Sequence, residues 1–221
     1  QLVRSHVPDI IVSDVMMPRM NGYKLCKTIK EDINISHIPV ILLTARDDRQ
    51  SQISGYKNGA DGYLSKPFEV EMLMELIRNR LKNREYTKKR YLNAGLIPTP
   101  EESTISLTDE TFLIKLNSII QENIDNTNLG IQFICQEVGL GRSSLYNKLK
   151  ALTGMGANEY ISKLRIEKAI TLISGTDMPF SEIAEKTGFT TPSYFSTAFK
   201  QYTGETPSQY KERKKKGLAG K

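Results

Sequence analysis

The second half of the chain carries one pattern twice, and this internal repeat constrains the fold more than any other feature. Residues 135–139 (CQEVG) match residues 184–188 (AEKTG), 49 positions later, and the next matching positions, among them Leu145 and Phe195, repeat at an offset of 50. Each copy has the pattern of a short helix, a turn with glycine where a positive φ is needed, and a second helix. The repeat predicts two helix-turn-helix units, separated by a long amphipathic helix over residues 157–174.

Residues 1–82 have a different pattern, in which short apolar runs alternate with amphipathic helical segments. The predicted strands cover residues 9–13, 39–43 and 62–65, and the predicted helices cover residues 22–32, 49–58 and 69–81. Uninterrupted apolar strands between helices indicate a parallel sheet covered on both faces, which is part of a doubly wound α/β fold. Gln1 is not an initiator methionine and the first strand follows almost at once, so we expect the chain to begin partway through this domain.

The composition narrows the class of protein. Of the 221 residues, 38% are hydrophobic and 25% charged, which suits two modest globular cores and leaves no run of about 20 apolar residues for a membrane span. The spacing of the two cysteines and two histidines suits neither a disulfide framework, nor a zinc site, nor a nucleophile–histidine pair. We therefore expect a cytoplasmic location without direct membrane contact. The net charge of +6 suits an anionic partner, although solvated helix ends explain it equally well.

Three polar residues follow the predicted strands: Asp14, Thr44 and Lys66. In parallel sheets, ligands bind beyond the carboxyl ends of the strands. A carboxylate nucleophile, a hydroxyl donor and an ammonium group that neutralises charge would together suit a phosphoryl group. Each residue alone is better explained as a polar residue at the point where a strand meets solvent.

These three residues lie in the segments 14–22, 38–45 and 59–68, and through these segments residues 1–82 resemble the response-regulator receiver domain. The resemblance implies a flavodoxin-like sheet with Asp14 as the phospho-acceptor. It also implies that Thr44 and Tyr63 are the switch pair.

The same resemblance implies that Lys66 contacts the phosphoryl group and that the Lys66–Pro67 bond is cis. It further implies a Mg²⁺ site in the intact receiver domain, to which this chain contributes only Asp14 and the carbonyl of Met16. We therefore expect this chain to bind no Mg²⁺ and to be phosphorylated inefficiently, whereas the intact protein would be phosphorylated.

The remaining boundaries follow from local composition. Residues 83–106 are interpreted as a linker, although their first part could also extend the preceding helix, which the second part, with its glycine and prolines, cannot do. An all-α domain is predicted over residues 107–213, beginning with a helix that Thr108 would cap, and a basic disordered tail over residues 214–221.

The duplicated units resemble the AraC-type DNA-binding domain, most clearly in the second copy, which reads IAEKTGF, YFSTAFK and TGETP over residues 183–207. The first copy departs from the family, because Gly141 stands where a capping serine is common and Gly156-Ala157 replaces the usual Ser-Pro. The resemblance implies two recognition helices that enter successive major grooves of double-stranded DNA.

Helical periodicity separates inward from outward positions of these two helices. The predicted core positions are Leu145, Leu149, Leu152, Phe195 and Phe199. The predicted DNA-contacting positions are Arg142, Ser143, Tyr146, Asn147, Lys150, Thr191, Ser193, Tyr194, Ser196, Thr197 and Lys200. Arg142 suits guanine and Asn147 suits adenine, although any one of these residues is equally well explained as solvated. Arg165 and Glu167 are interpreted as a structural ion pair.

The combined pattern predicts a sequence-specific transcription regulator of a two-component phosphorelay, in which receiver phosphorylation controls DNA binding. The expected partners are double-stranded DNA, a cognate histidine kinase and a second copy of the chain. The same layout occurs at the end of hybrid sensor kinases, so the intact parent is either such a kinase or a free regulator, while this chain itself has no further catalytic residues. The alternative is a phosphorelay interaction module whose helical half docks a protein partner.

Overall fold

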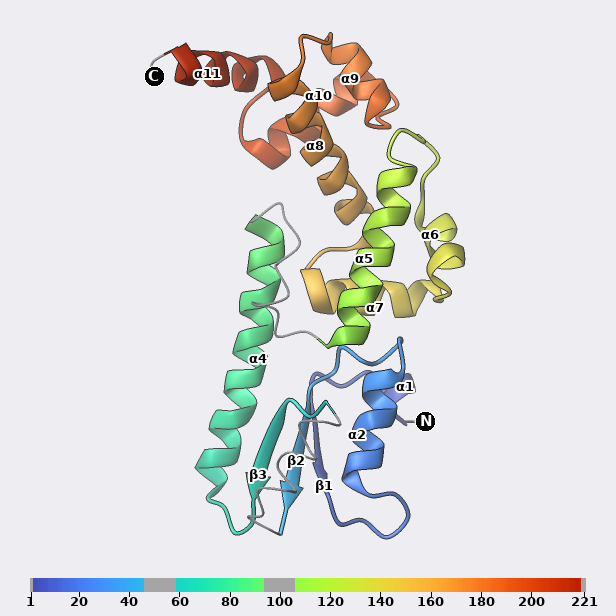
Figure 1. Ribbon diagram of the computed structural model, residues 1–221, viewed down its shortest axis with the longest axis vertical. Coiled ribbons are helices and arrows are strands. Elements are labelled where there is room, and N and C mark those ends of the chain that lie inside the picture. The colour runs from blue at the N-terminus through green and yellow to red at the C-terminus, as the bar shows by residue number, and fades with distance from the viewer. Residues whose placement is uncertain (1, 46–58, 94–105, 220–221) are drawn as a thin grey trace. The chain divides into compact units, whose positions relative to one another are not determined.

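The computed structural model describes residues 2–45, 59–93 and 106–219 (Figure 1). The helix predicted over residues 49–58 and the proline-containing part of the predicted linker lie outside the described residues. The chain divides into two compact units. Unit 1 comprises Gln1–Ile114 and Ser143–Gly154, and unit 2 comprises Lys115–Arg142 and Met155–Lys221.

Unit 1 contains a parallel three-stranded sheet in the order β1-β2-β3 (Figure 1). Its strands are β1 (Ile11–Asp14), β2 (Val40–Thr44) and β3 (Gly62–Ser65). The accompanying helices are α1 (Leu2–His6), α2 (Gly22–Glu31) and α4 (Val70–Asn93). The predicted parallel α/β arrangement is therefore confirmed.

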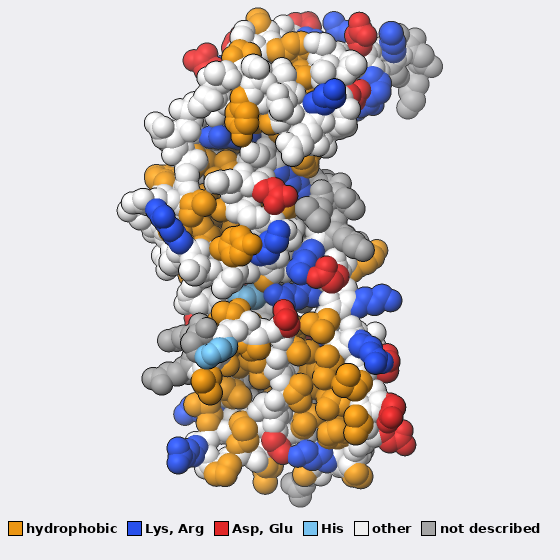
Figure 2. All heavy atoms as spheres, turned by 180° about the vertical axis from the view of Figure 1, so that it is seen from behind, with side chains coloured by type: hydrophobic (Ala, Val, Ile, Leu, Met, Phe, Trp, Pro, Cys, Tyr) orange, Lys and Arg blue, Asp and Glu red, His pale blue; other side chains and the backbone are white. Residues whose placement is uncertain are grey.

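The core of this sheet follows the apolar pattern of the sequence. Val40, Ile41 and Leu42 of β2 are fully buried, and Val40 and Leu42 share one core with Cys26 and Ile29 of α2. Burying these side chains stabilises the fold at roughly 25 cal/mol per Å² of apolar surface. The edge strand β1 is less covered than predicted, because its Val12 is 38% exposed. Figure 2 shows that apolar side chains gather on one face of the sheet-containing part of unit 1.

Helix α4 is longer than predicted. It begins at Val70, close to the expected start, but continues to Asn93, through the first eleven residues of the predicted linker. Lysine, arginine and glutamate are good helix formers, so the basic run extends the preceding helix instead of ending it.

Unit 1 also contains the first part of α5 (Leu107–Glu122) and most of α7 (Arg142–Thr153). The predicted cap at Thr108 is wrong, because the hydroxyl of Ser106 accepts the N–H of Asp109 at 3.2 Å. The Thr108 hydroxyl instead donates to the carbonyl of Lys30 at 2.9 Å. Because Thr108 lies two residues after the capping Ser106, the backbone N–H groups that it would cap are already bonded within the helix, so its hydroxyl bonds elsewhere.

Unit 2 contains the remaining helices: α6 (Ile131–Val138), α8 (Ala157–Gly175), α9 (Phe180–Lys186), α10 (Pro192–Thr203) and α11 (Pro207–Ala219). Helices α8, α9, α10 and α11 enclose one core (Figure 1). Its buried members are Ile166, Ala169, Ile173, Ile183, Ala184, Phe189, Phe195, Phe199 and Tyr210. The aromatic rings form a chain of tilted and edge-on contacts with centroids 5.3–5.7 Å apart, which is the favourable geometry for such pairs.

The predicted disordered tail is helical over most of its length, because α11 continues to Ala219. Residues 214–216 are lysines, which favour helices, and the helix already started at Pro207 has no breaker until its glycine near the end. Of the helices in the described ranges, none has the length and apolar character needed to cross a membrane.

Candidate phosphoryl site and nucleic-acid interface

The carboxyl ends of the three strands bring the predicted phosphoryl-site residues together. Asp14 ends β1 and pairs in register with Leu43 of β2, while Thr44 ends β2 and pairs with Ser65 of β3. Lys66 follows β3 directly, and its N–H donates to the Thr44 carbonyl at 2.6 Å. The Lys66–Pro67 peptide is cis, as predicted.

Asp14 and Lys66 are in direct contact. The Lys66 ammonium donates to Oδ2 of Asp14, and the N–H of Met16 donates to Oδ1 at 3.0 Å. The hydrogen bond from Lys66, reinforced by the Met16 N–H, lowers the pKa of the Asp14 carboxyl below its ordinary value. Asp14 is therefore an ionised carboxylate at neutral pH, which is the state required of a nucleophile.

Gly22 allows the start of α2 to lie against Asp14. Its N–H donates to the Val15 carbonyl at 3.0 Å, and a Cβ atom at this position would lie 2.5 Å from the carbonyl oxygen of Asp14. Only glycine permits this close approach. The loop after β1 consequently folds back beside the strand end.

The two predicted switch residues have different surroundings. Thr44 is buried, whereas Tyr63 is half-buried and its hydroxyl lies 2.8 Å from the hydroxyl of Tyr23 on α2. Tyr23 is absent from the predicted site residues, because an aromatic residue in the first turn of an amphipathic helix is ordinarily a packing residue. Its hydroxyl gives the predicted switch tyrosine a partner on a different element.

The receiver resemblance implies a Mg²⁺ ion, and the described residues do not fit one. Within residues 2–45, 59–93 and 106–219, no group of three or more histidine, cysteine, aspartate or glutamate side chains could hold a metal. Asp14 is the carboxylate at the strand ends, and Lys66 already occupies one of its oxygens. The chemistry available to these residues is that of an ionised carboxylate beside an ammonium group.

The second helix-turn-helix unit is formed by α9 and α10. Gly188 in the turn has φ of 70°, as predicted, and the Thr191 hydroxyl accepts the N–H of Tyr194 at 3.1 Å, which caps α10 in front of Pro192. Phe195 and Phe199 face the core and are fully buried, as the periodicity predicted.

The outward face of α10 carries the predicted contact residues. Of these, Ser196 is half-buried and the others are exposed: Thr191, Ser193, Tyr194, Thr197 and Lys200. An open hollow on this face is lined by Ser196, Thr197, Lys200, Gln201 and Thr206. The sequence analysis did not include Gln201 and Thr206, which would have been found by extending the same helical face by one residue and into the following turn.

The first helix-turn-helix unit, formed by α6 and α7, has the same turn geometry as the second. Gly139 ends α6 with φ of 73°, and α7 begins at Arg142. The predicted core positions Leu145, Leu149 and Leu152 are buried. Of the predicted contact residues in α7, Asn147 is half-buried and four are exposed: Arg142, Ser143, Tyr146 and Lys150. The guanidinium of Arg142 donates to Oε1 of Gln132 at 3.1 Å, which holds it at the start of the helix.

The predicted ion pair between Arg165 and Glu167 is wrong. Arg165 is buried and donates to the carbonyls of Ile124 at 3.3 Å and Asn126 at 2.6 Å. Glu167 instead pairs with Lys163 at 3.7 Å and accepts the hydroxyl of Tyr202 at 3.1 Å. Residues two apart on a helix point in different directions, so each side chain meets a different part of the unit.

A parallel sheet with polar strand ends, followed by two helix-turn-helix units, defines the class of response regulators with a DNA-binding output. The model of the response regulator receiver domain matches residues 1–78, and that of a helix-turn-helix domain matches residues 134–213. The probable transcriptional regulator ycf29 of Pyropia yezoensis is 30% identical over 162 residues, which cover 68% of this chain and 73% of that protein. The chain belongs to the response-regulator family and joins a receiver domain to an AraC-type helix-turn-helix domain.

Other similar proteins are matched over different lengths. Histidine kinase P4 of Formosa agariphila is 42% identical over 213 residues, 96% of this chain, but the chain spans only 16% of that protein. The C-terminal domain of AraT, a response regulator from Geobacillus stearothermophilus, is a solved structure with 30% identity and a TM-score of 0.44. This match covers 46% of this chain and 84% of that one.

Proposed function

We propose that this chain is the receiver and output part of a two-component transcription regulator, in which phosphorylation of Asp14 controls sequence-specific DNA binding by residues 107–213. The observation that carries the proposal is the outward face of α10. Its hydroxyl and lysine side chains stand on a helix whose opposite face is fixed by buried Phe195 and Phe199. A rigid helix with exposed hydrogen-bonding groups suits insertion into a major groove.

The two helices have different expected roles in recognition. Arg142 and Asn147 on α7 have the donor patterns that suit guanine and adenine edges, whereas Lys150 and Lys200 suit phosphates. The hydroxyl groups and Tyr146 and Tyr194 extend the same two surfaces. We assign the two helices to successive major grooves on one side of the duplex.

The proposed input is a phosphoryl group transferred from a cognate histidine kinase to Asp14. A carboxylate oxygen of Asp14 forms the new O–P bond while the bond from phosphorus to the donor breaks, and Lys66 neutralises charge on the phosphoryl oxygens. Thr44 and Tyr63 then respond to the new group. Receiver domains generally use Mg²⁺ for this step, and this chain would contribute to such a site only the carboxylate of Asp14 and the carbonyl of Met16, since the described residues hold no cluster of three or more metal-binding side chains.

The proposed protein acts as a regulator and not as an enzyme in its own right, since Asp14 is a phosphoryl acceptor. We place it in the cytoplasm, where DNA and the kinase are accessible, and propose that a second copy pairs two DNA-binding domains. Because the relative that matches 96% of this chain is named a histidine kinase, we also propose that kinase and regulator can share one polypeptide.

Selection of duplexes from a random pool, followed by a gel shift with random competitor, tests the proposal. Arg142→Ala should weaken binding to the selected site by roughly 1–3 kcal/mol and relax preference at one position. Lys200→Gln should weaken binding to all sequences and reduce the salt dependence by about one phosphate contact. The matched control is Lys168→Gln, which replaces an exposed lysine on α8 and should leave DNA binding unchanged.

The alternative, a helical half that docks a protein partner, predicts a different result. In that case the folded chain shows no salt-dependent, sequence-selective DNA binding, and Arg142→Ala and Lys168→Gln are indistinguishable. That outcome would remove DNA recognition from the proposal while leaving the phosphoryl site untouched.

A further inference from the structure

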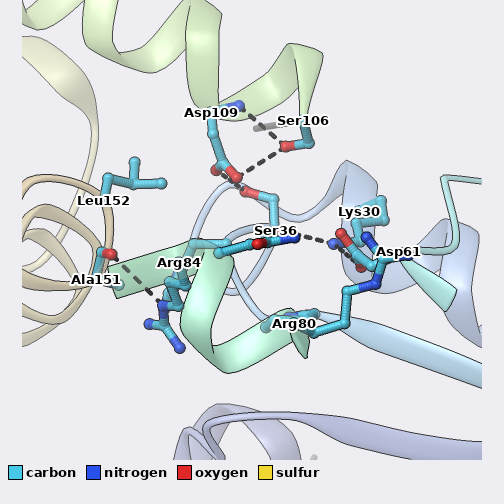
Figure 3. Close-up of a pocket in the computed structure, with 12 residues that line it drawn as sticks. Lys30, Ser36, Asp61, Arg80, Arg84, Ser106, Asp109, Ala151 and Leu152 are labelled. Atoms are coloured by element: carbon cyan, nitrogen blue, oxygen red, sulfur yellow. Dashed lines mark hydrogen bonds and ion pairs between the residues drawn. The ribbon is translucent and has the colours of Figure 1, made fainter. Parts of the chain in front are cut away.

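A cavity of about 70 Å³ lies within unit 1 (Figure 3), and its lining does not include Asp14, Thr44 or Lys66 of the phosphoryl site. Its polar lining comes from α2, α4 and α5 and from the segments just before β2, β3 and α5. Lys30 lies beside Asp61 at 2.7 Å, and Asp109 accepts hydrogen bonds from Ser36 and Ser106 at 2.7 and 2.8 Å. Asp109 also pairs with the buried Lys148. The two carboxylates of the cavity are therefore already neutralised by lysines.

Arg84, on α4, is a largely buried cation without a comparable anion. Its side chain is 19% exposed, and its hydrogen bonds go to neutral carbonyls, those of Asp9 at 3.3 Å and Ala151 at 3.5 Å. Its ion pair within the described part of the chain is with Asp9 at 3.9 Å, and the Asp9 side chain is 90% exposed. A largely buried guanidinium is costly unless an anion accompanies it, and a solvated carboxylate at this distance compensates little.

Two buried polar atoms at the same cavity have no hydrogen-bond partner among the described residues: Nε of Arg80 and Nδ1 of His37. His37 is 7% exposed, and burial, together with the nearby ammonium of Lys148, lowers its pKa to about 4. The imidazole is therefore neutral at pH 7, and with its proton on Nε2 it offers Nδ1 as an acceptor. Buried polar atoms ordinarily have partners, so unsatisfied ones beside a cavity point to a bound polar species.

We propose that this cavity binds a small tetrahedral oxyanion of the phosphate class, held by Arg80 and Arg84, with His37 accepting the proton of hydrogenphosphate. Guanidinium groups match phosphate oxygens with paired, charge-assisted hydrogen bonds. One water needs about 10–15 Å³ by the same measure, so the cavity has room for a few waters or one such ion but not for a nucleotide. The bound ion would supply the anion that Arg84 lacks and stabilise unit 1 independently of DNA binding or of Asp14.

Isothermal titration of the chain with inorganic phosphate at constant ionic strength tests the site. We expect saturable binding of one phosphate. Sulfate should bind several-fold more weakly because it carries no proton for His37 at neutral pH, and acetate more weakly still. Arg80→Gln and Arg84→Gln should each raise the dissociation constant for phosphate about tenfold to a hundredfold, the size expected for the loss of a charged hydrogen bond.

Two controls separate this site from general charge effects. Arg78→Gln removes an exposed arginine of the same helix, which pairs with Glu75, and Lys168→Gln removes an exposed lysine of α8 that lies outside both proposed sites. Both should leave the phosphate affinity within about twofold of the parent, a change too small for a lost charged contact. Circular dichroism establishes that each variant is folded, and if Arg84→Gln is not, Arg80→Gln carries the test.

The histidines provide a direct readout, since His6 and His37 are the two in the chain. Phosphate should shift the imidazole ¹⁵N resonances of His37 and leave those of His6 unchanged, with assignment by a His6→Gln variant. The proposal is overturned if the folded chain shows no saturable phosphate binding, if Arg80→Gln binds phosphate as the parent does, or if His37 does not respond.

Discussion

The two turn glycines, Gly139 and Gly188, allow the effect of backbone conformation to be separated from that of crowding. Their φ values are nearly equal, 73° and 70°. A Cβ atom on Gly139 would meet nothing within 4 Å. On Gly188 it would lie 2.3 Å from the carbonyl oxygen of Ile124 and 2.7 Å from Nη2 of Arg165. Alanine at either position adopts the same strained conformation, but only alanine at Gly188 must displace a hydrogen-bonded guanidinium.

The magnitudes follow from these contacts. The left-handed conformation costs an alanine roughly 1–2 kcal/mol. Alanine also reduces the conformational entropy of the unfolded chain, which offsets about 0.4–1 kcal/mol of this cost. Gly139→Ala should therefore destabilise by about 1 kcal/mol. Gly188→Ala should additionally disrupt the hydrogen bonds from Arg165 to the carbonyls of Ile124 and Asn126, which adds about 1.5–3 kcal/mol for a charged donor.

Urea unfolding followed by circular dichroism measures both variants against the parent, because both glycines lie in unit 2. We expect Gly188→Ala to lose about 2 kcal/mol more free energy of unfolding than Gly139→Ala, the charged hydrogen-bond contribution. Equal losses in the two variants would show that the conformational cost alone governs these turns. The role assigned to Arg165 would then be refuted.

Three further predictions concern unit 1 and the two thiols. Asp109→Leu leaves the Lys148 ammonium buried without its partner and should lower the free energy of unfolding by about 3–5 kcal/mol. Adding Lys148→Met should restore most of this stability. If the double variant is no more stable than Asp109→Leu in urea unfolding, the loss does not come from the unpaired lysine. The pKa of Asp14 is held below its ordinary value of 3.8 by its lysine partner, so the stability from that contact is present above pH 3.8 and lost as the pH falls through the lowered folded value. Carboxyl NMR titration checks this, and a midpoint above 3.8 contradicts it. Burial raises the pKa of the Cys26 thiol to about 11, so iodoacetamide at pH 8 should label the half-buried Cys135 first. Mass spectrometry follows the labelling of each cysteine, and faster labelling of Cys26 would contradict the prediction.

The elements that local patterns determine were predicted well. The three strands lie within one residue or two of their predicted bounds, and Thr191 and Pro192 start α10 as expected. Gly188 adopts its positive φ for the same reason, since the turn geometry depends only on the backbone of a few neighbouring residues. The inward and outward faces of α7 and α10 follow directly from a period of 3.6 residues.

Helix ends that no glycine or proline marks were predicted less well. Helix α4 passes through the basic start of the predicted linker, and α11 passes through the predicted tail. The predicted boundaries place both runs of lysine and arginine in the linker and the tail, although solvated helix ends explain these runs equally well. Charged residues with long side chains extend a helix that has already begun, because adding a residue to an existing helix is far easier than starting one.

The sequence by itself determined the strand ends that bear Asp14, Thr44 and Lys66 and the duplicated helix-turn-helix pattern, because periodicity, caps and turn glycines act over a few residues. Only the tertiary structure decided the partners of the long or polar side chains. Arg165 bonds to carbonyls some forty residues away, Tyr23 contacts Tyr63, and the largely buried Arg84 has only an exposed aspartate, Asp9, as its ion-pair partner among the described residues. A flexible side chain reaches several elements with similar ease, so its contacts depend on which of them the folded chain brings within hydrogen-bonding distance.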